Sequence, residues 1–276
     1  MSDTPPNQNQ AFFDKVERSF RDLFERARAR HELHFAMSLM AEMRGMQDAG
    51  WNTAEDAHRA FDEYLTFINS AKGAIKFRVA LAFYCHVAEA AGFYEIPKNM
   101  LRVAGGESHV LWPFLHLVEA HRTTGNRIAP NANKVLKNLA GHAEILGLHE
   151  LAEVFRDAFD ADVRNGYAHA DYIIWNDGLR LRKRNGGQPR SIPWEDFGAI
   201  FDRGINLFHI LRQLVQEAIQ SYSEPRTIKA RLSNEPEMEW TIFYDLDGRF
   251  GITSGKHERG QPNNAFNRRR ANTPAP

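Results

Sequence analysis

Apolar residues recur at intervals of three or four along most of the chain, which is the spacing of an amphipathic helix. Helices are predicted over residues 11–45, 53–69, 71–93, 113–124, 130–145, 148–169 and 193–222. Glycines and prolines between these segments mark the expected ends: the Gly105-Gly106 pair breaks the chain, and Pro97 is expected to lie beyond the third helix. The pattern therefore predicts a mainly α protein built as a helical bundle.

The periodicity changes to that of β-strands after Asp171. Residues 172–175 and 179–182 flank Asn176-Asp177-Gly178, which is typical of a hairpin turn. Strands are also predicted over residues 227–232, 239–244 and 249–253. The chain is thus expected to form a helical domain over residues 11–223 with a short β-hairpin insertion, then a small C-terminal antiparallel β-ribbon over 224–254. The polar segments 1–10 and 255–276 are expected to be disordered tails.

Composition gives no overall field that would draw the protein to nucleic acid. The chain of 276 residues holds 35 Lys and Arg and 35 Asp and Glu, so any such attraction must be local. The single Cys85 excludes an internal disulfide and fits a reducing cytoplasm. No apolar run has the length of a membrane span, and the first ten residues lack the pattern of a signal peptide. We therefore expect a cytoplasmic protein with no membrane partner.

Metal and cofactor sites are not indicated either. The 12 histidines include no His-Glu-x-x-His pattern, and Glu55-x-x-His58 occurs without the second copy that a di-iron bundle needs. A group of three histidines, His109, His116 and His121, lacks a carboxylate on the same helix face. No glycine-rich phosphate loop precedes a helix. We expect neither a metal nor a cofactor.

Candidate chemistry gathers instead at the end of the predicted helix 148–169. On a helix Asn165 and His169 are four residues apart and share a face. Arg164 falls to one side of them, so the three lie within an arc of about 140°. Apolar residues of the same helix lie on a different arc, which we expect to face the core: Leu151, Phe155 and Phe159. Packing therefore does not require the polar trio.

These three side chains suit an anionic substrate whose reaction moves protons. A guanidinium binds phosphate through a planar fork and keeps its charge. Imidazole gives or takes a proton near neutral pH. An arginine separated from a following histidine by four to six residues occurs elsewhere in the chain, but there Ala, Val or Gly follows the arginine. Arg164 differs because Asn165 comes directly after it.

The pattern Arg-Asn-x-x-x-His at a helix end, followed by Ala-Asp, a hairpin and a long helix, resembles the HEPN superfamily of helical domains over residues 141–222. The resemblance implies a HEPN-like bundle, and many members are metal-independent endoribonucleases of toxin–antitoxin and anti-phage systems. It implies proton transfer at the ribose 2′-OH by His169 and stabilisation of the phosphorane-like charge by Arg164. Asn165 would orient the histidine or a phosphate oxygen.

The expected partners follow from this chemistry. RNA cleavage needs an acid and a base, while one chain supplies one such histidine. A two-fold homodimer with a composite active site is therefore expected, with RNA as substrate. The resemblance also implies an antitoxin protein as a partner.

The alternative is a non-catalytic helical module that binds RNA, a nucleotide or a partner protein through the same surface. In that case we expect Arg164 to pair with Asp160 or Asp162, and His169 to cap the helix.

A basic stretch follows the motif on the predicted hairpin and the loop after it. It contains Arg180, Arg182, Lys183, Arg184 and Arg190. One interpretation is a phosphate track that binds RNA beside the motif. The other is a hairpin edge that is kept from aggregating by its charge.

Overall fold

The computed structural model describes residues 9–40, 53–183, 186–232 and 236–255. It divides into two compact units, with the boundary between Ala218 and Ile219. The protein is mainly α, as predicted. No helix in the described part of the chain has the combination of length and apolar character that crossing a membrane requires.

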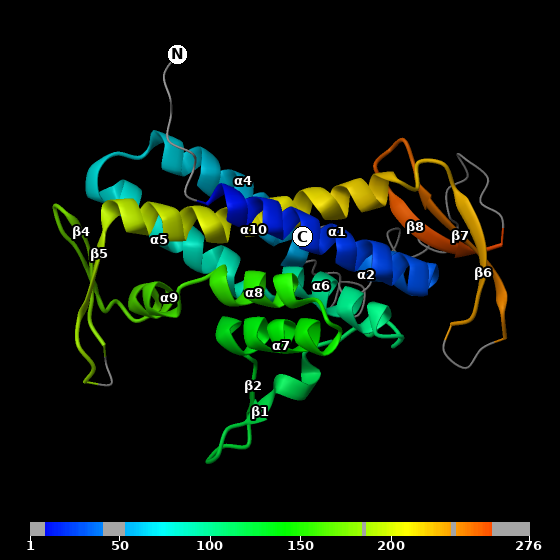
Figure 1. Ribbon diagram of the computed structural model, residues 1–276, viewed down its shortest axis with the longest axis horizontal. Helices are drawn as coiled ribbons and strands as arrows, with labels where there is room; N and C mark the ends of the chain where they lie inside the picture. The colour runs from blue at the N-terminus through cyan, green and yellow to red at the C-terminus, as the bar shows by residue number, and fades with distance from the viewer. Residues whose placement is uncertain (1–8, 41–52, 184–185, 233–235, 256–276) are drawn as a thin grey trace, which may run out of the picture. The chain divides into compact units, whose positions relative to one another are not determined.

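Unit 1 holds the helices (Figure 1). They are α1 (Gln10–Arg30), α2 (Glu32–Leu39), α4 (Thr53–Ser70), α5 (Gly73–Glu89), α6 (Ala91–Ala104), the 3-10 turn η1 (Leu115–Leu117), α7 (Ala132–Ile145), α8 (His149–Asp157), α9 (Ala161–Ala168) and α10 (Trp194–Gln220), whose last two residues belong to unit 2. Its strands are β1 (Glu119–Ala120), β2 (Arg127–Ile128), β3 (Tyr172–Ile174), β4 (Gly178–Leu181) and β5 (Arg190–Pro193).

Four of the predicted helices differ from the structure. The helix expected over 11–45 is divided at His31 into α1 and α2, and residues 41–45 lie outside the described residues. The helix expected over 71–93 ends at Glu89, and α6 begins after Ala90 and contains Pro97 in its interior. Residues 96–101 of α6 are all buried, so burial outweighs the proline's cost to the helix. The helix expected over 113–124 is also wrong, because this region forms only η1, β1 and the turn before β2.

The single helix expected over 148–169 is in fact two helices, α8 and α9. Asp160 separates them as the N-cap of α9: its Oδ1 accepts the backbone N–H groups of Asp162 at 2.9 Å and Val163 at 3.1 Å. The Tyr84 hydroxyl of α5 accepts the backbone N–H of Asp160 at 2.6 Å. A capping carboxylate stabilises a new helix start by about 1 kcal/mol, which explains the break.

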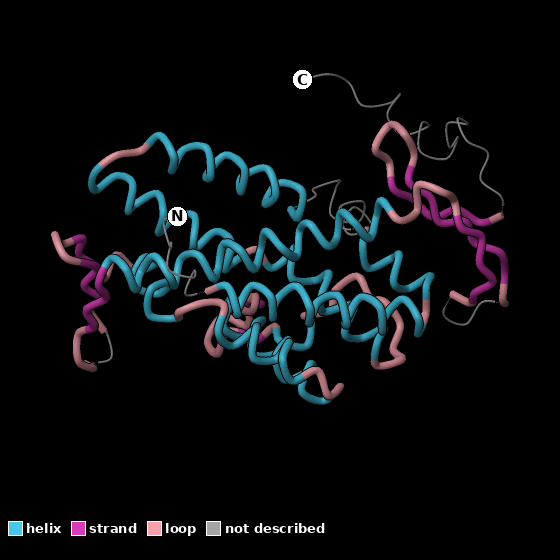
Figure 2. The backbone as a smooth tube through the Cα atoms, turned by 45° about the horizontal axis from the view of Figure 1, so that its top comes forward, coloured by secondary structure: helices cyan, strands magenta, loops and turns pink. Residues whose placement is uncertain are grey.

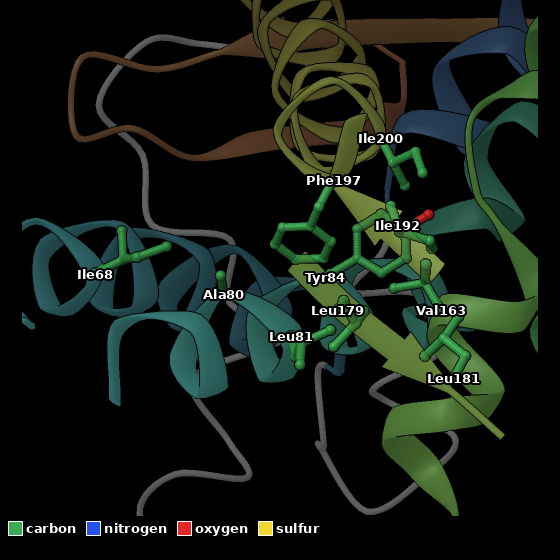
Figure 3. Close-up of a cluster of buried hydrophobic side chains, with 10 residues drawn as sticks. All are labelled: Ile68, Ala80, Leu81, Tyr84, Val163, Leu179, Leu181, Ile192, Phe197 and Ile200. Carbon is green, nitrogen blue, oxygen red and sulfur yellow. The ribbon is translucent and has the colours of Figure 1, made fainter. Parts of the chain in front are cut away.

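The hairpin after α9 carries a third strand that the sequence pattern did not predict. The sheet order is β3-β4-β5, antiparallel, with Leu179 opposite both Ile174 and Ile192. The inner face of this sheet packs on α5, α9 and α10, and Figure 3 shows the shared core. The cluster consists of Ile68, Ala80, Leu81, Tyr84, Val163, Leu179, Leu181, Ile192, Phe197 and Ile200. Burying each large side chain contributes roughly 1.5–3 kcal/mol, so this core fixes α9 against the hairpin.

Unit 2 contains the predicted C-terminal ribbon. Strands β6 (Arg226–Ala230), β7 (Met238–Tyr244) and β8 (Phe250–Ser254) form an antiparallel sheet in that order, drawn in magenta in Figure 2. Gly248 has φ +83°, as the predicted Asp247-Gly248 turn requires. The Phe243 ring covers Gly251, where a Cβ would lie 2.6 Å from the ring. The tails expected at 1–10 and 255–276 fall largely outside the described residues.

Candidate functional site

Helix α9 packs against α5 and β4. Val163 is fully buried, and a Cβ at Gly166 would lie 2.7 Å from Leu181 Cδ2, so helix and strand are in close contact. Cys85 on α5 donates its thiol to the Arg164 carbonyl oxygen at 3.7 Å. Burial raises the pKa of Cys85 to about 12, so the thiol stays protonated and acts as a packing group, not as a nucleophile.

Arg164 is the buried member of the predicted trio, with 7% of the residue exposed. Its Nη1 donates to Glu89 Oε1, and its Nη2 donates to Asn165 Oδ1 at 2.7 Å. The other Glu89 oxygen accepts the backbone N–H of Ala132, the first residue of α7, at 3.1 Å. The guanidinium therefore joins α5 to α9, and Glu89 joins both to α7.

The expected pairing of Arg164 with Asp160 or Asp162 is wrong. Asp160 accepts Arg190 Nη1 at 2.7 Å, and Asp162 lies 3.2 Å from Lys183 Nζ. These acids point toward the hairpin, whereas the Arg164 guanidinium points toward α5.

Asn165 and His169 are the exposed members of the trio. They are neighbours along one side of α9, and the His169 backbone N–H donates to the Asn165 carbonyl at 3.1 Å. His169 occupies the C-cap position of α9, as expected for the non-catalytic alternative, but its ring is not buried in the protomer. The structure thus places the Asn165 amide and the His169 imidazole at the surface, whereas the neighbouring Arg164 guanidinium is buried.

The helix ends at Ala168 in a Schellman turn that includes His169. The backbone N–H of Asp171 donates to Gly166 O at 2.8 Å, and that of Ala170 donates to Tyr167 O at 3.0 Å. Ala170 has φ 54°, a conformation usually left to glycine in this motif. Such a residue stores about 1 kcal/mol of backbone strain, which the packing around it must offset.

Most cations of the predicted phosphate track have acidic partners within the protein. Arg180 Nη2 lies 2.7 Å from Asp177, while Lys183 and Arg190 contact the two acids at the start of α9. Arg182 is exposed and its guanidinium has no partner among the described residues, and Arg184 lies outside them. The local excess of positive charge is therefore smaller than the sequence indicated.

Glu89 is a residue of the site that the sequence pattern did not predict. The available signal was a carboxylate in a largely apolar helix, because a charge beside buried surface needs a partner. The contact of Arg78, about three turns before Glu89 on α5, was also not predicted. Its Nη1 donates to the Tyr172 hydroxyl at 2.9 Å, beside the end of α9.

Several other histidines of unit 1 are partly buried. Burial lowers the pKa of His58, His109 and His142 to about 4 in each case, so these rings are neutral near pH 7. Within the described ranges, no group of three or more His, Cys, Asp or Glu side chains is arranged to hold a metal ion.

No protein-family model matches the chain, and the comparisons with curated proteins and with solved structures also gave no match.

Proposed function

We propose that the protein is a metal-independent endoribonuclease whose site is the exposed end of α9. The observation that supports this most is the exposure of both Asn165 and His169, four residues apart on α9, next to a guanidinium that is fixed by Glu89. A neutral donor beside a titratable ring suits a phosphodiester next to a ribose hydroxyl. The resemblance to HEPN ribonucleases points to the same reaction.

In the proposed reaction, His169 removes the proton of the 2′-OH and the 2′ oxygen attacks the adjacent phosphorus. The bond to the 5′ oxygen breaks, and that oxygen takes a proton from an acid. The products are a 2′,3′-cyclic phosphate and a 5′-OH end. The acid in this scheme is His169 of a second copy, so the active form is a homodimer with a composite site.

The biological extension of the proposal is a toxin or anti-phage role in the cytoplasm, with an antitoxin protein as partner. Arrest of growth on induced expression, relieved by His169→Ala, is the expected result. Unchanged growth with confirmed cleavage in vitro would remove this extension and leave the enzyme proposal intact.

The second candidate is a non-catalytic module that binds RNA, a nucleotide or a partner protein. The covered and ion-paired state of Arg164 favours it, because a charge that is already offset contributes less to a phosphate. Binding of RNA without cleavage by the intact protein would select this candidate.

The deciding experiment incubates purified protein with single-stranded and structured RNA in EDTA. His169→Ala is expected to lower the cleavage rate by about 10²-fold or more, since general acid–base catalysis contributes 10²–10⁴-fold. The matched control is His149→Ala: this imidazole is 72% exposed on α8 and pairs with Glu144. Equal cleavage by all three proteins would identify a contaminant and end the catalytic assignment.

A further inference from the structure

We infer that Glu89 and Arg164 are positioning residues, which hold the Asn165 amide so that its N–H groups, beside His169, meet a phosphate oxygen of the substrate. This inference rests on the proposed function and gives its residues a new division of roles. It moves the anion contact from the arginine to the asparagine.

The orientation of the amide follows from hydrogen-bond chemistry. A guanidinium has only donors, so the atom of Asn165 that faces Arg164 Nη2 at 2.7 Å must be the carbonyl oxygen. The Nδ2 group is then directed away from Arg164, on a residue that is exposed. Arg164 therefore decides which end of the amide reaches the surface, and it presents the donor end.

Burial and charge argue against a direct role for Arg164 in holding the anion. Its side chain is 9% exposed, and the carboxylate of Glu89 already offsets its charge. An incoming phosphate would reach the exposed amide before this guanidinium, and the anionic Glu89 beside the guanidinium would oppose closer approach. A short, neutral donor on the surface does not have that disadvantage.

Glu89 can fix Arg164 because it is itself held from a third helix. Its second oxygen accepts the Ala132 N–H at 3.1 Å, so the carboxylate cannot turn to follow a moving guanidinium without losing that bond. One turn earlier on α5, Cys85 donates to the Arg164 carbonyl. Helix α5 thus holds both the backbone and the side chain of Arg164.

The first test is a double-mutant cycle on the cleavage rate with Arg164→Met and Asn165→Ala. If Arg164 acts through Asn165, the double variant should cleave as slowly as Asn165→Ala alone, within about twofold. Each single substitution should lower kcat by a larger factor than it raises KM. If the fold reductions in rate of the two single variants multiply in the double variant, Arg164 contacts the substrate directly, and the inference is overturned.

The second test changes Glu89 and leaves Arg164 in place. Glu89→Gln keeps one acceptor oxygen, enough for Arg164 or for Ala132 but not for both through separate atoms, and should retain part of the cleavage rate. Glu89→Ala should lose as much as Arg164→Met. Glu144→Gln is the matched control, because Glu144 makes comparable ion pairs with Arg156 and His149 at the surface of α7. Equal rates for Glu89→Ala and the wild type would overturn the role of Glu89.

The third test does not depend on cleavage. In protein labelled with ¹⁵N at asparagine, the side-chain N–H pair of Asn165, assigned by its loss in Asn165→Ala, should shift and sharpen in Arg164→Met and Glu89→Ala but not in Glu144→Gln. That response in a protein that cuts no RNA would uphold the positioning and refute the proposed function. Unmoved Asn165 signals in a protein that does cut RNA would refute the positioning alone.

Discussion

Helix α9 and the hairpin that follows it both carry closely spaced polar residues, yet the structure uses them in opposite ways. In α9 the charged Arg164 is covered, and the uncharged Asn165 and the titratable His169 are exposed. In the hairpin the cations stay near the surface, but Arg180 and Lys183 have acidic partners. The number of charges along a segment therefore does not give the charge that a ligand would meet. Intramolecular acids decide that, whether they lie in the same hairpin, as Asp177 does for Arg180, or on another element, as Asp162 does for Lys183.

The largest expected effect comes from breaking the core that α9 and the hairpin share. Leu181→Ala should lower the free energy of unfolding by about 2–5 kcal/mol, since the side chain is fully enclosed and packs under Gly166. Urea unfolding measures this. The control is Ile173→Ala on the opposite face of the sheet, where the side chain is 59% exposed and a loss within about 0.5 kcal/mol is expected. Equal losses would show that the sheet's inner face does not anchor α9.

The next effect concerns His58, a partly buried histidine of α4. Burial, with Arg212 nearby, lowers the pKa of His58 to about 4 from a usual value near 6.5. In the unfolded chain His58 takes up its proton first as pH falls, so its contribution is complete above pH 6.5 and is lost between pH 6.5 and 4. The loss amounts to at most about 3 kcal/mol.

Urea unfolding measured across this pH range tests that prediction. His58→Leu should reduce the number of protons taken up on unfolding by about one. If the free energy of unfolding depends on pH in the same way in His58→Leu as in the wild type, His58 titrates alike in the folded and unfolded states.

A smaller effect is expected at the junction of the two regions. Asp160→Ala removes the N-cap of α9 and one of the two acidic partners of Arg190, and should lower stability by about 1–2 kcal/mol. Asp162→Ala loses only surface pairs and should cost under about 1 kcal/mol. Thermal unfolding of both variants gives the ranking, and the reverse order would place the important contact at Asp162.

The smallest effect compares two arginines of the hairpin in RNA binding. Arg182→Ala should reduce the slope of log affinity against log salt by close to 1, because its guanidinium has no partner in the described part of the chain. Arg180→Ala should change that slope less, since Asp177 offsets its charge. Filter binding at several salt concentrations measures both slopes. Identical slopes for these variants would indicate that the internal ion pair does not reduce the charge available to RNA.

Local sequence signals predicted much of the fold. The turn pair Asp247-Gly248 located the C-terminal strands within a few residues, and the apolar spacing of 193–222 predicted α10. The failures lie where tertiary contacts decide. The Asn99 side chain bonds to both backbone groups of Val110, which helps to fix the following segment as a loop where a helix was expected. Strand β5 was missed because Arg190–Pro193 is short and ends in proline.

The candidate site was predicted only in its local part. The spacing of Asn165 and His169 gave their common side of α9 correctly, because one helix fixes it. The burial of Arg164 was not predictable from that helix, since it depends on Glu89, which is 75 residues away along the chain. For the same reason the pairing of Arg190 with Asp160 could not be read from the motif.

The dependence of α9 on α5 has a consequence for work with shortened chains. An excised piece spanning only residues 141–222 would keep every residue of the Arg-Asn-x-x-x-His pattern but lose Tyr84 and Glu89, which fix the start of the helix and its arginine. Such a fragment carries the motif without the helix that holds it in place. Grafting the Arg-Asn-x-x-x-His segment alone onto another protein would likewise transfer the residues without their geometry.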